Sequence, residues 1–194
     1  MDIRIEKTEK AIKAAFLELR EQKPLEKLKV KELCEKAQIN KSTFYAHYQD
    51  IYALSQAMEQ ELVRSVLGSL PPVSWQDLRE RPEWLTRQLF QAFQQNSRAV
   101  NLLFSGSREG LFVNRIESGL RELTSREDPD HWKDPVRSIV LSFCVQGSYY
   151  AFSNNIGQMD AETLVEILGA ASRAAQNIRP LAEAGASAEP EGDA

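Results

Sequence analysis

Apolar residues along this chain recur at the spacing of a helix almost from end to end. In the first segment, Ile12, Phe16 and Leu19 fall on one side of a helix over about residues 5–22, because positions three and four apart share a face. No stretch of useful length alternates apolar and polar residues as a half-buried strand does. The pattern therefore predicts an all-α protein of about nine helices.

The expected boundaries follow from residues that cap or stop helices. Pro24 lies just beyond the first helix, Asp50 is the expected N-cap of the fourth, and Gly68 with Pro71 and Pro72 ends that helix. The expected helices cover about residues 5–22, 30–36, 41–48, 51–67, 75–96, 97–104, 108–124, 134–154 and 161–179. Residues 182–194 are mostly Ala, Glu, Gly, Pro and Ser, and this composition predicts a disordered tail.

The segment 30–48 is the most informative part of the sequence. Its first eight residues place four apolar or small side chains at i, i+3, i+4 and i+7, which is one buried helical face. These residues are Val30, Leu33, Cys34 and Ala37. Ile39 supplies an apolar side chain in the turn that follows, and Asn40 is an expected cap for the next helix. Two short helices joined by a tight turn predict a helix-turn-helix.

The second helix of this pair has an outward face without acidic residues. Phe44 and Tyr48 are four apart and face inward. The outward residues are Lys41, Ser42, Tyr45 and Ala46, with Thr43 and His47 on the flanks. Lysine and hydroxyl groups reach phosphates and base edges, so this face suits a helix in the DNA major groove rather than a generic surface helix. The net charge of −4 divides into +3 over residues 1–48 and −7 over the remainder.

These residues carry a resemblance to a known family, because Thr8 to Leu54 resembles the DNA-binding domain of TetR-family transcriptional regulators. The matching residues are Ile12, Ala15, Phe16, Val30, Leu33, Ala37, Ile39 to Tyr45, His47, Tyr48 and Leu54. The string from Ser42 to Tyr48 is the most specific part. The resemblance implies a three-helix DNA-binding domain over residues 1–49 and a helical regulatory and dimerisation domain over 50–181, with helix 50–68 as connector.

The same resemblance assigns roles to the reading helix. It implies phosphate contacts from Thr43, Tyr45 and His47, and base or groove contacts from Lys41 and Ser42. The full expected DNA-binding set is Lys29, Asn40, Lys41, Ser42, Thr43, Tyr45, His47 and Tyr48, of which Tyr48 is expected mainly to pack. Because the family acts on two-fold symmetric operators, the expected partner is a palindromic DNA duplex with half-sites about 34–36 Å apart.

Three residues depart from the family pattern. Gln38 stands where the family usually has glycine, and a left-handed backbone there costs a non-glycine residue about 1–2 kcal/mol. Ile51 replaces a lysine that commonly contacts phosphate, so one electrostatic contact is expected to be missing. Lys29 replaces a usual threonine at the start of the second helix, which loses a cap and adds a donor for phosphate.

The last two long helices carry apolar and small residues that step by 4 and 3, the rhythm of helices that pack in pairs. The resemblance implies a homodimer through these helices, and the alternative is packing within one chain. One set contains Val136, Val140, Phe143, Gly147 and Tyr150, and the other contains Leu164, Leu168, Ala171, Ala175 and Ile178. The expected dimer residues are Val140, Phe143, Gly147, Leu164, Leu168, Ala171, Ala175 and Ile178.

An effector pocket is expected inside the C-terminal helices, as the resemblance implies. Its expected lining residues are Phe93, Phe104, Phe112, Phe143, Gln146 and Tyr150. Gln146 and Tyr150 are the better clues, since a polar group on an inward face needs a partner. No charged lining residue is evident, so the expected effector is neutral or weakly polar. His131 and Trp132 are expected at the surface and as an anchor beside the polar break at residues 127–130.

Composition narrows the possible functions further. Cys34 and Cys144 lie far apart in apolar stripes, no closely spaced metal ligands occur, and no apolar run approaches the ~20 residues of a membrane span. With two histidines and no catalytic or phosphate-binding spacing, we expect no enzyme, no cofactor and a cytoplasmic protein. The leading hypothesis is a repressor released by a small effector. An activator, a regulator controlled by a protein, and a helical interaction module that does not bind DNA remain open.

Overall fold

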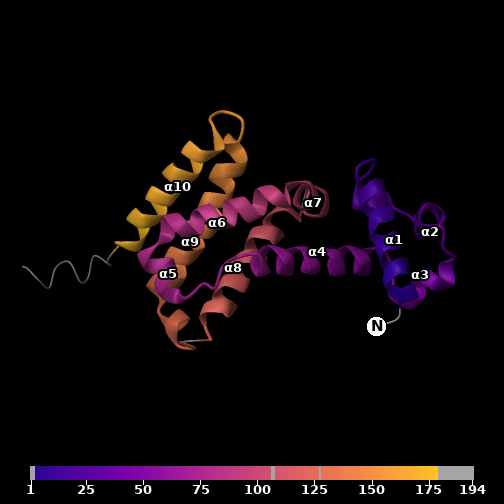
Figure 1. Ribbon diagram of the computed structural model, residues 1–194, viewed down its shortest axis with the longest axis horizontal. Coiled ribbons are helices and arrows are strands. Elements are labelled where there is room, and N and C mark those ends of the chain that lie inside the picture. Colours follow the sequence, from indigo (N-terminus) through magenta and orange to yellow (C-terminus); the bar gives the residue numbers. More distant parts are fainter. Residues whose placement is uncertain (1–2, 106–107, 127, 179–194) are drawn as a thin grey trace, which may run out of the picture. The chain divides into compact units, whose positions relative to one another are not determined.

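The computed structural model of the protein describes residues 3–105, 108–126 and 128–178, and within them it is all-helical with no strand (Figure 1). The α-helices are α1 (Ile3–Arg20), α2 (Val30–Ala37), α3 (Lys41–His47), α4 (Ile51–Gly68), α5 (Trp75–Glu80), α6 (Pro82–Gln95), α7 (Ser97–Leu103), α8 (Glu109–Thr124), α9 (Pro135–Asn155) and α10 (Ala161–Gln176). Two short 3₁₀ helices are η1 (Leu25–Lys27) and η3 (His131–Lys133). The all-α prediction is confirmed, and the expected tail at 182–194 lies outside the described residues.

The single helix expected over residues 75–96 is wrong, because the structure divides it into α5 and α6. The break falls at Arg81, whose φ of −133° and ψ of 48° are not helical. The cause is local: the ring of Pro82 disfavours the helical conformation of the residue before it, while proline itself is well suited to a first helical position. The described residues therefore hold ten α-helices, one more than expected.

The chain forms two compact units. The first contains the described residues up to Ser69 together with Phe93–Phe112, and the second contains the described part of Leu70–Ala92 and of the chain from Val113 onward. In the first unit, α1 packs on α2 and α7, α2 packs on α3, and α4 packs on α7. Its core includes Ile12, Phe16, Leu33, Phe44 and Leu54, none of which has any exposed area. Each such side chain contributes about 1.5–3 kcal/mol by burial.

Two cations, the buried Arg20 and the half-buried Arg108, hold helices of the first unit together. The Arg20 guanidinium at the end of α1 donates to the carbonyl of Leu102 at 2.7 Å and to the hydroxyl of Ser105 at 2.9 Å. One nitrogen of Arg108 donates to both carboxylate oxygens of Glu59 on α4, at 2.6 and 2.7 Å. The Glu59 side chain is fully buried, so its carboxylate has no contact with water, and the Arg108 guanidinium supplies the compensating positive charge.

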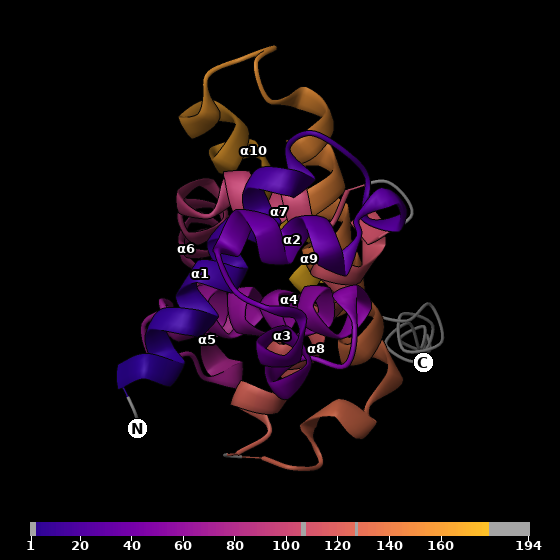
Figure 2. The ribbon, with the colours of Figure 1, turned by 90° about the vertical axis from the view of Figure 1, so that its right-hand side faces the viewer.

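In the second unit, α9 and α10 run side by side and are joined by a short connection at residues 156–160, as both ribbon views show (Figure 1 and Figure 2). The rings of Phe90 on α6 and Phe152 on α9 stack with centroids 4.3 Å apart. A further apolar cluster contains Leu78, Leu85 and Leu141.

Helices α6 and α10 approach closely at a glycine. A Cβ atom added at Gly169 would lie 3.0 Å from the Cα of Glu83, tighter than ordinary van der Waals contact. The Glu83 carboxylate accepts from the Arg173 guanidinium one turn further along α10, at 2.6 and 2.5 Å. Gly169 therefore allows the two helices to approach closely, and the ion pair between Glu83 and Arg173 joins them.

Candidate nucleic-acid interface

The turn between α2 and α3 is built around a residue in the left-handed region. Gln38 has φ 55° and ψ 43°, and it is the one described non-glycine residue with a positive φ. The N–H of Ile39 donates to the carbonyl of Cys34 at 3.0 Å, and the N–H of Gln38 donates to that of Glu35 at 3.3 Å. These two bonds form a Schellman motif, which satisfies the last carbonyls of α2. Of the two possibilities for this turn, strained or reshaped, the left-handed backbone at Gln38 is the strained one.

The first turn of α3 is fixed by Asn40, and the expected cap is confirmed. Its side-chain oxygen accepts the backbone N–H of Thr43 at 2.7 Å. The same oxygen also accepts the hydroxyl of Ser42 at 2.7 Å and that of Thr43 at 2.8 Å. Both hydroxyl protons are therefore already used, and each would have to leave Asn40 before it could be donated to another acceptor. Asn40 thus orders the helix and the side chains beside it.

The side chains of α3 have the exposure that the sequence pattern predicts. Phe44 is fully buried, whereas the exposed side chains are Lys41, Ser42, Tyr45 and Ala46. Thr43 and His47 are half-buried on the flanks. The helix carries no acidic residue. Neither Lys41 nor Tyr45 forms a hydrogen bond or ion pair with any described residue, so the Lys41 ammonium and the Tyr45 hydroxyl are the donors available on this face.

Tyr48 points back to α1 rather than outward. Its ring lies 6.0 Å from that of Phe44, and its hydroxyl donates to the Glu9 carboxylate at 3.4 Å. Burial, together with the nearby negative charge of Glu9, raises the pKa of Tyr48 to about 12. The phenol stays protonated at physiological pH. The packing role expected for this residue agrees with these contacts.

Lys29 and Ile51, which depart from the TetR-family pattern, lie just before α2 and at the start of α4. Lys29 precedes α2 and is exposed, and its side chain makes no capping hydrogen bond. Ile51 opens α4 and is buried, so it contributes to the core of the first unit. The N-cap of α4 is Asp50, whose carboxylate accepts the N–H of Ala53 at 2.7 Å, as expected.

The six expected effector-pocket residues divide equally between the two units. In the first unit, the Phe104 and Phe112 rings lie 5.2 Å apart and those of Phe93 and Phe112 lie 6.0 Å apart, with Phe104 and Phe112 buried. In the second unit, Phe143 and Tyr150 are exposed. The assembly of these six residues into one effector pocket stays a prediction.

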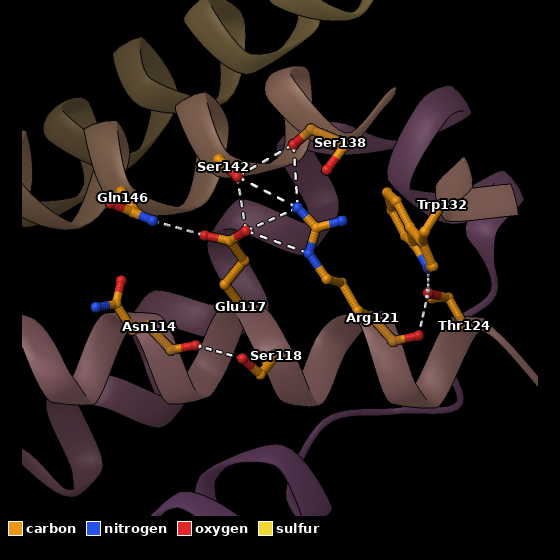
Figure 3. A network of polar contacts seen from close by, with 9 residues as sticks. All are labelled: Asn114, Glu117, Ser118, Arg121, Thr124, Trp132, Ser138, Ser142 and Gln146. Carbon is orange, nitrogen blue, oxygen red and sulfur yellow. Dashed lines mark hydrogen bonds and ion pairs between the residues drawn. The ribbon is translucent and has the colours of Figure 1, made fainter. Parts of the chain in front are cut away.

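Gln146, the sixth of these residues, is satisfied within the second unit by a polar network that the sequence pattern did not indicate (Figure 3). The buried Glu117 carboxylate accepts from Gln146 at 2.7 Å, from the Ser142 hydroxyl at 2.6 Å and from Arg121 at 2.8 Å. Burial alone opposes ionisation of Glu117, but these hydrogen bonds and the Arg121 charge together lower its pKa. The carboxylate joins α8 to α9, and Gln146 has its partner there.

The expected dimer residues also fall into two groups. Val140, Leu164, Leu168 and Ala175 are buried within the chain, whereas Phe143, Gly147, Ala171 and Ile178 are exposed. Two further isoleucines, Ile139 and Ile167, are 67% and 52% exposed, and sequence periodicity did not single them out. Ile139, Phe143 and Gly147 follow one another by four residues along α9, which gives this helix an exposed, largely apolar row.

No family model matches the sequence, and no curated protein matches it. Among the described residues, no group of three or more His, Cys, Asp and Glu side chains is arranged to hold a metal ion. No described helix combines the length and the apolar character that crossing a membrane requires. The two cysteines are not paired with each other.

Proposed function

We propose that this chain is a sequence-specific DNA-binding transcriptional regulator that acts as a dimer. In this proposal α2, the turn at Gln38 and α3 form a helix-turn-helix, with α3 as the helix that enters the major groove. The resemblance of Thr8 to Leu54 to TetR-family domains favours a repressor that a small effector releases from its operator.

The observation that carries the proposal is the outward face of α3. It presents an ammonium and a phenol hydroxyl that form no hydrogen bond or ion pair with a described residue, it has no acidic side chain, and its first turn is ordered by Asn40. An ordered helix face with available donors suits DNA, because donors to phosphate oxygens position a protein and donors to base edges give it specificity. Lys41 is the candidate for base recognition, and Tyr45 is the candidate for phosphate contact.

The exposed apolar row on α9 supports the dimer. Ile139 and Phe143 are 67% and 64% exposed, and Ile178 beyond the end of α10 is 59% exposed. Large apolar side chains gathered on one exposed face mark an interaction surface. A second copy of the chain is the partner that a two-fold symmetric operator requires, because each copy supplies one reading helix.

The first test is selection from a randomised duplex library by the purified full-length protein, followed by sequencing of the retained DNA. We expect one palindromic motif. Affinity for a duplex with that motif should fall as salt rises, because neutralising phosphates releases counterions. A correctly folded dimer that retains no DNA above background would contradict the proposal and favour the interaction-module alternative.

Two substitutions on α3 separate recognition from positioning. Tyr45→Phe removes only the hydroxyl, so we expect weaker binding to all sequences with an unchanged salt slope, because a neutral donor displaces no counterion. Lys41→Gln should cost about 1–3 kcal/mol on the selected motif and relax its sequence preference. Lys133→Gln is the matched control, because it removes one exposed lysine charge in the second unit. Equal effects of Lys41→Gln and Lys133→Gln would show that α3 does not read DNA.

The dimer is tested separately by light scattering after size-exclusion chromatography. Phe143→Arg places a charge in the exposed row of α9 and should shift the mass from dimer to monomer. Ile5→Arg is the control, since Ile5 is 49% exposed on α1 and lies outside that row. A native protein that is monomeric at micromolar concentration, or a Phe143→Arg variant that remains dimeric, would remove this face from the proposal.

A further inference from the structure

A cavity of about 210 Å³ lies within the second unit, among α5, η3, α9 and the end of α10. Its polar and aromatic lining comes from Trp75, Arg79, His131, Trp132, Arg137 and Gln176. An apolar cavity of about 150 Å³ is large enough to bind benzene, while pockets for drug-sized ligands measure about 300–1,000 Å³. The space therefore suits a ligand with one or two small rings.

The expectation that His131 lies at the surface is wrong, because only 6% of it is exposed. Its ring lies 5.0 Å from the Trp75 ring and 4.7 Å from the Trp132 ring. Trp132 is itself fixed, since its indole N–H donates to the Thr124 hydroxyl at 3.2 Å (Figure 3). The Arg121 guanidinium lies 5.0 Å from the centroid of the Trp132 ring. Trp132 is thus held in place by side chains outside the cavity, while Trp75 packs against the His131 ring within its wall.

The hydrogen bonds of His131 identify its tautomer. Nη1 of Arg137 lies 3.2 Å from Nδ1 of His131, and a guanidinium can only donate, so Nδ1 accepts and the proton is on Nε2. The Asp128 carboxylate is 3.7 Å from the same Nδ1, too far for a hydrogen bond. Burial, followed by the charge of Arg137, lowers the pKa of His131, so the ring is neutral at physiological pH. The Nε2–H has no acceptor among the described residues.

Two guanidinium groups line the cavity, and only one of them is paired with a carboxylate of a described residue. Arg137 is paired with Asp134, whose carboxylate lies 3.2 Å from its Nε. Arg79 is four residues after Trp75, on the same face of α5, and forms no ion pair or hydrogen bond with a described residue. Arg79 is exposed to solvent at the edge of the cavity, so its donors are open to a ligand. A guanidinium binds a carboxylate through two parallel hydrogen bonds, which makes a carboxylate the best match for it.

We propose that this cavity binds a small planar aromatic carboxylate, with the carboxylate on Arg79 and the ring against Trp75 and Trp132. The site is distinct from the expected effector pocket, and none of its residues is shared with that set. This proposal does not depend on the proposed DNA-binding function, because ligand binding to the cavity is measured with the protein alone.

The test is calorimetric titration of the full-length protein with benzoate and with indole-3-carboxylate. Benzamide has the ring without the charge, and acetate has the charge without the ring. We expect saturable binding of at least one aromatic acid. Benzamide should bind about tenfold more weakly or worse because it cannot form the charged hydrogen bonds with Arg79, and acetate should do so because it lacks the ring.

Variants locate the site. Arg79→Gln should weaken binding of the aromatic acid about tenfold or more. Lys133→Gln should leave it unchanged, because Lys133 is the exposed last residue of η3, pairs with Asp130 and does not line the cavity. The proposal is overturned if neither acid binds saturably at millimolar concentration, if acetate binds as tightly as they do, or if Arg79→Gln binds like the native protein. Circular dichroism of Arg79→Gln verifies that it is folded.

Discussion

Replacing Gln38 with glycine should stabilise the first unit. The native residue has φ 55° and ψ 43°, a conformation that costs a residue with a Cβ atom about 1–2 kcal/mol and costs glycine nothing. About 0.5–1 kcal/mol of this gain is offset, because glycine has more conformational freedom than glutamine in the unfolded chain and so loses more entropy on folding. The Schellman hydrogen bonds use backbone groups only, so the substitution leaves them intact. The expected net gain in the free energy of unfolding is about 0.5–1 kcal/mol.

The assay is urea unfolding followed by circular dichroism at one protein concentration. Tryptophan fluorescence serves as an internal comparison, since Trp75, Trp84 and Trp132 all belong to the second unit. We expect Gln38→Gly to raise the urea midpoint of the helical signal and to change the fluorescence midpoint less. The slope of the transition should stay the same, because the surface exposed on unfolding does not change.

Two controls show whether the gain comes from the left-handed backbone. Gln38→Ala keeps a Cβ atom and should not stabilise. Gln60→Gly places glycine at an exposed position within α4 and should destabilise by about 1 kcal/mol. A Gln38→Gly variant no more stable than native, or an alanine variant equally stabilised, would refute the reasoning that this backbone is strained.

Three further outcomes follow from buried polar groups. Glu59→Leu leaves Arg108 without its anion and should lower the free energy of unfolding by about 3 kcal/mol, and the double variant with Arg108→Leu should recover part of this loss in the same urea assay. The pKa of Glu117 is lowered from its ordinary 4.5, so its contribution to the free energy of unfolding is complete above pH 4.5 and is lost as pH falls through its pKa in the folded protein. Urea midpoints measured against pH should therefore fall less steeply on the acid side in Glu117→Gln than in the native protein. Spectrophotometric titration should reveal a tyrosine with a pKa of about 12 that is missing in Tyr48→Phe, and its presence in that variant would reassign the shift to another residue.

Local rules predicted the features that depend on neighbours in sequence. The caps at Asn40 and Asp50 need only a few consecutive residues, and both are present in the structure. The break before Pro82 was also a local signal, and the wider apolar periodicity of residues 75–96 obscured it. For α3, a buried Phe44 follows from helical spacing alone.

Features that depend on distant segments were not predictable in the same way. His131 is buried because Trp75, more than fifty residues earlier, packs against its ring. A heptad rhythm shows which residues share a helical stripe but not whether that stripe is covered, so it grouped the buried Val140 with the exposed Phe143. Similarly, Glu117 belongs to a sequence pattern typical of a surface helix, and only α9 supplies the donors that allow its burial.

Gly169 sets a limit on how this protein can vary. Any side chain at this position meets the backbone of Glu83, which cannot rotate out of the way, so the spacing of α6 and α10 must widen by a few tenths of an ångström. The Arg173 guanidinium is carried on α10 and would move away from the Glu83 carboxylate with it. The exposed face of the same helix would be displaced too. The missing side chain at Gly169 thus sets the position of α10, and with it the position of the exposed face that a partner chain would have to match.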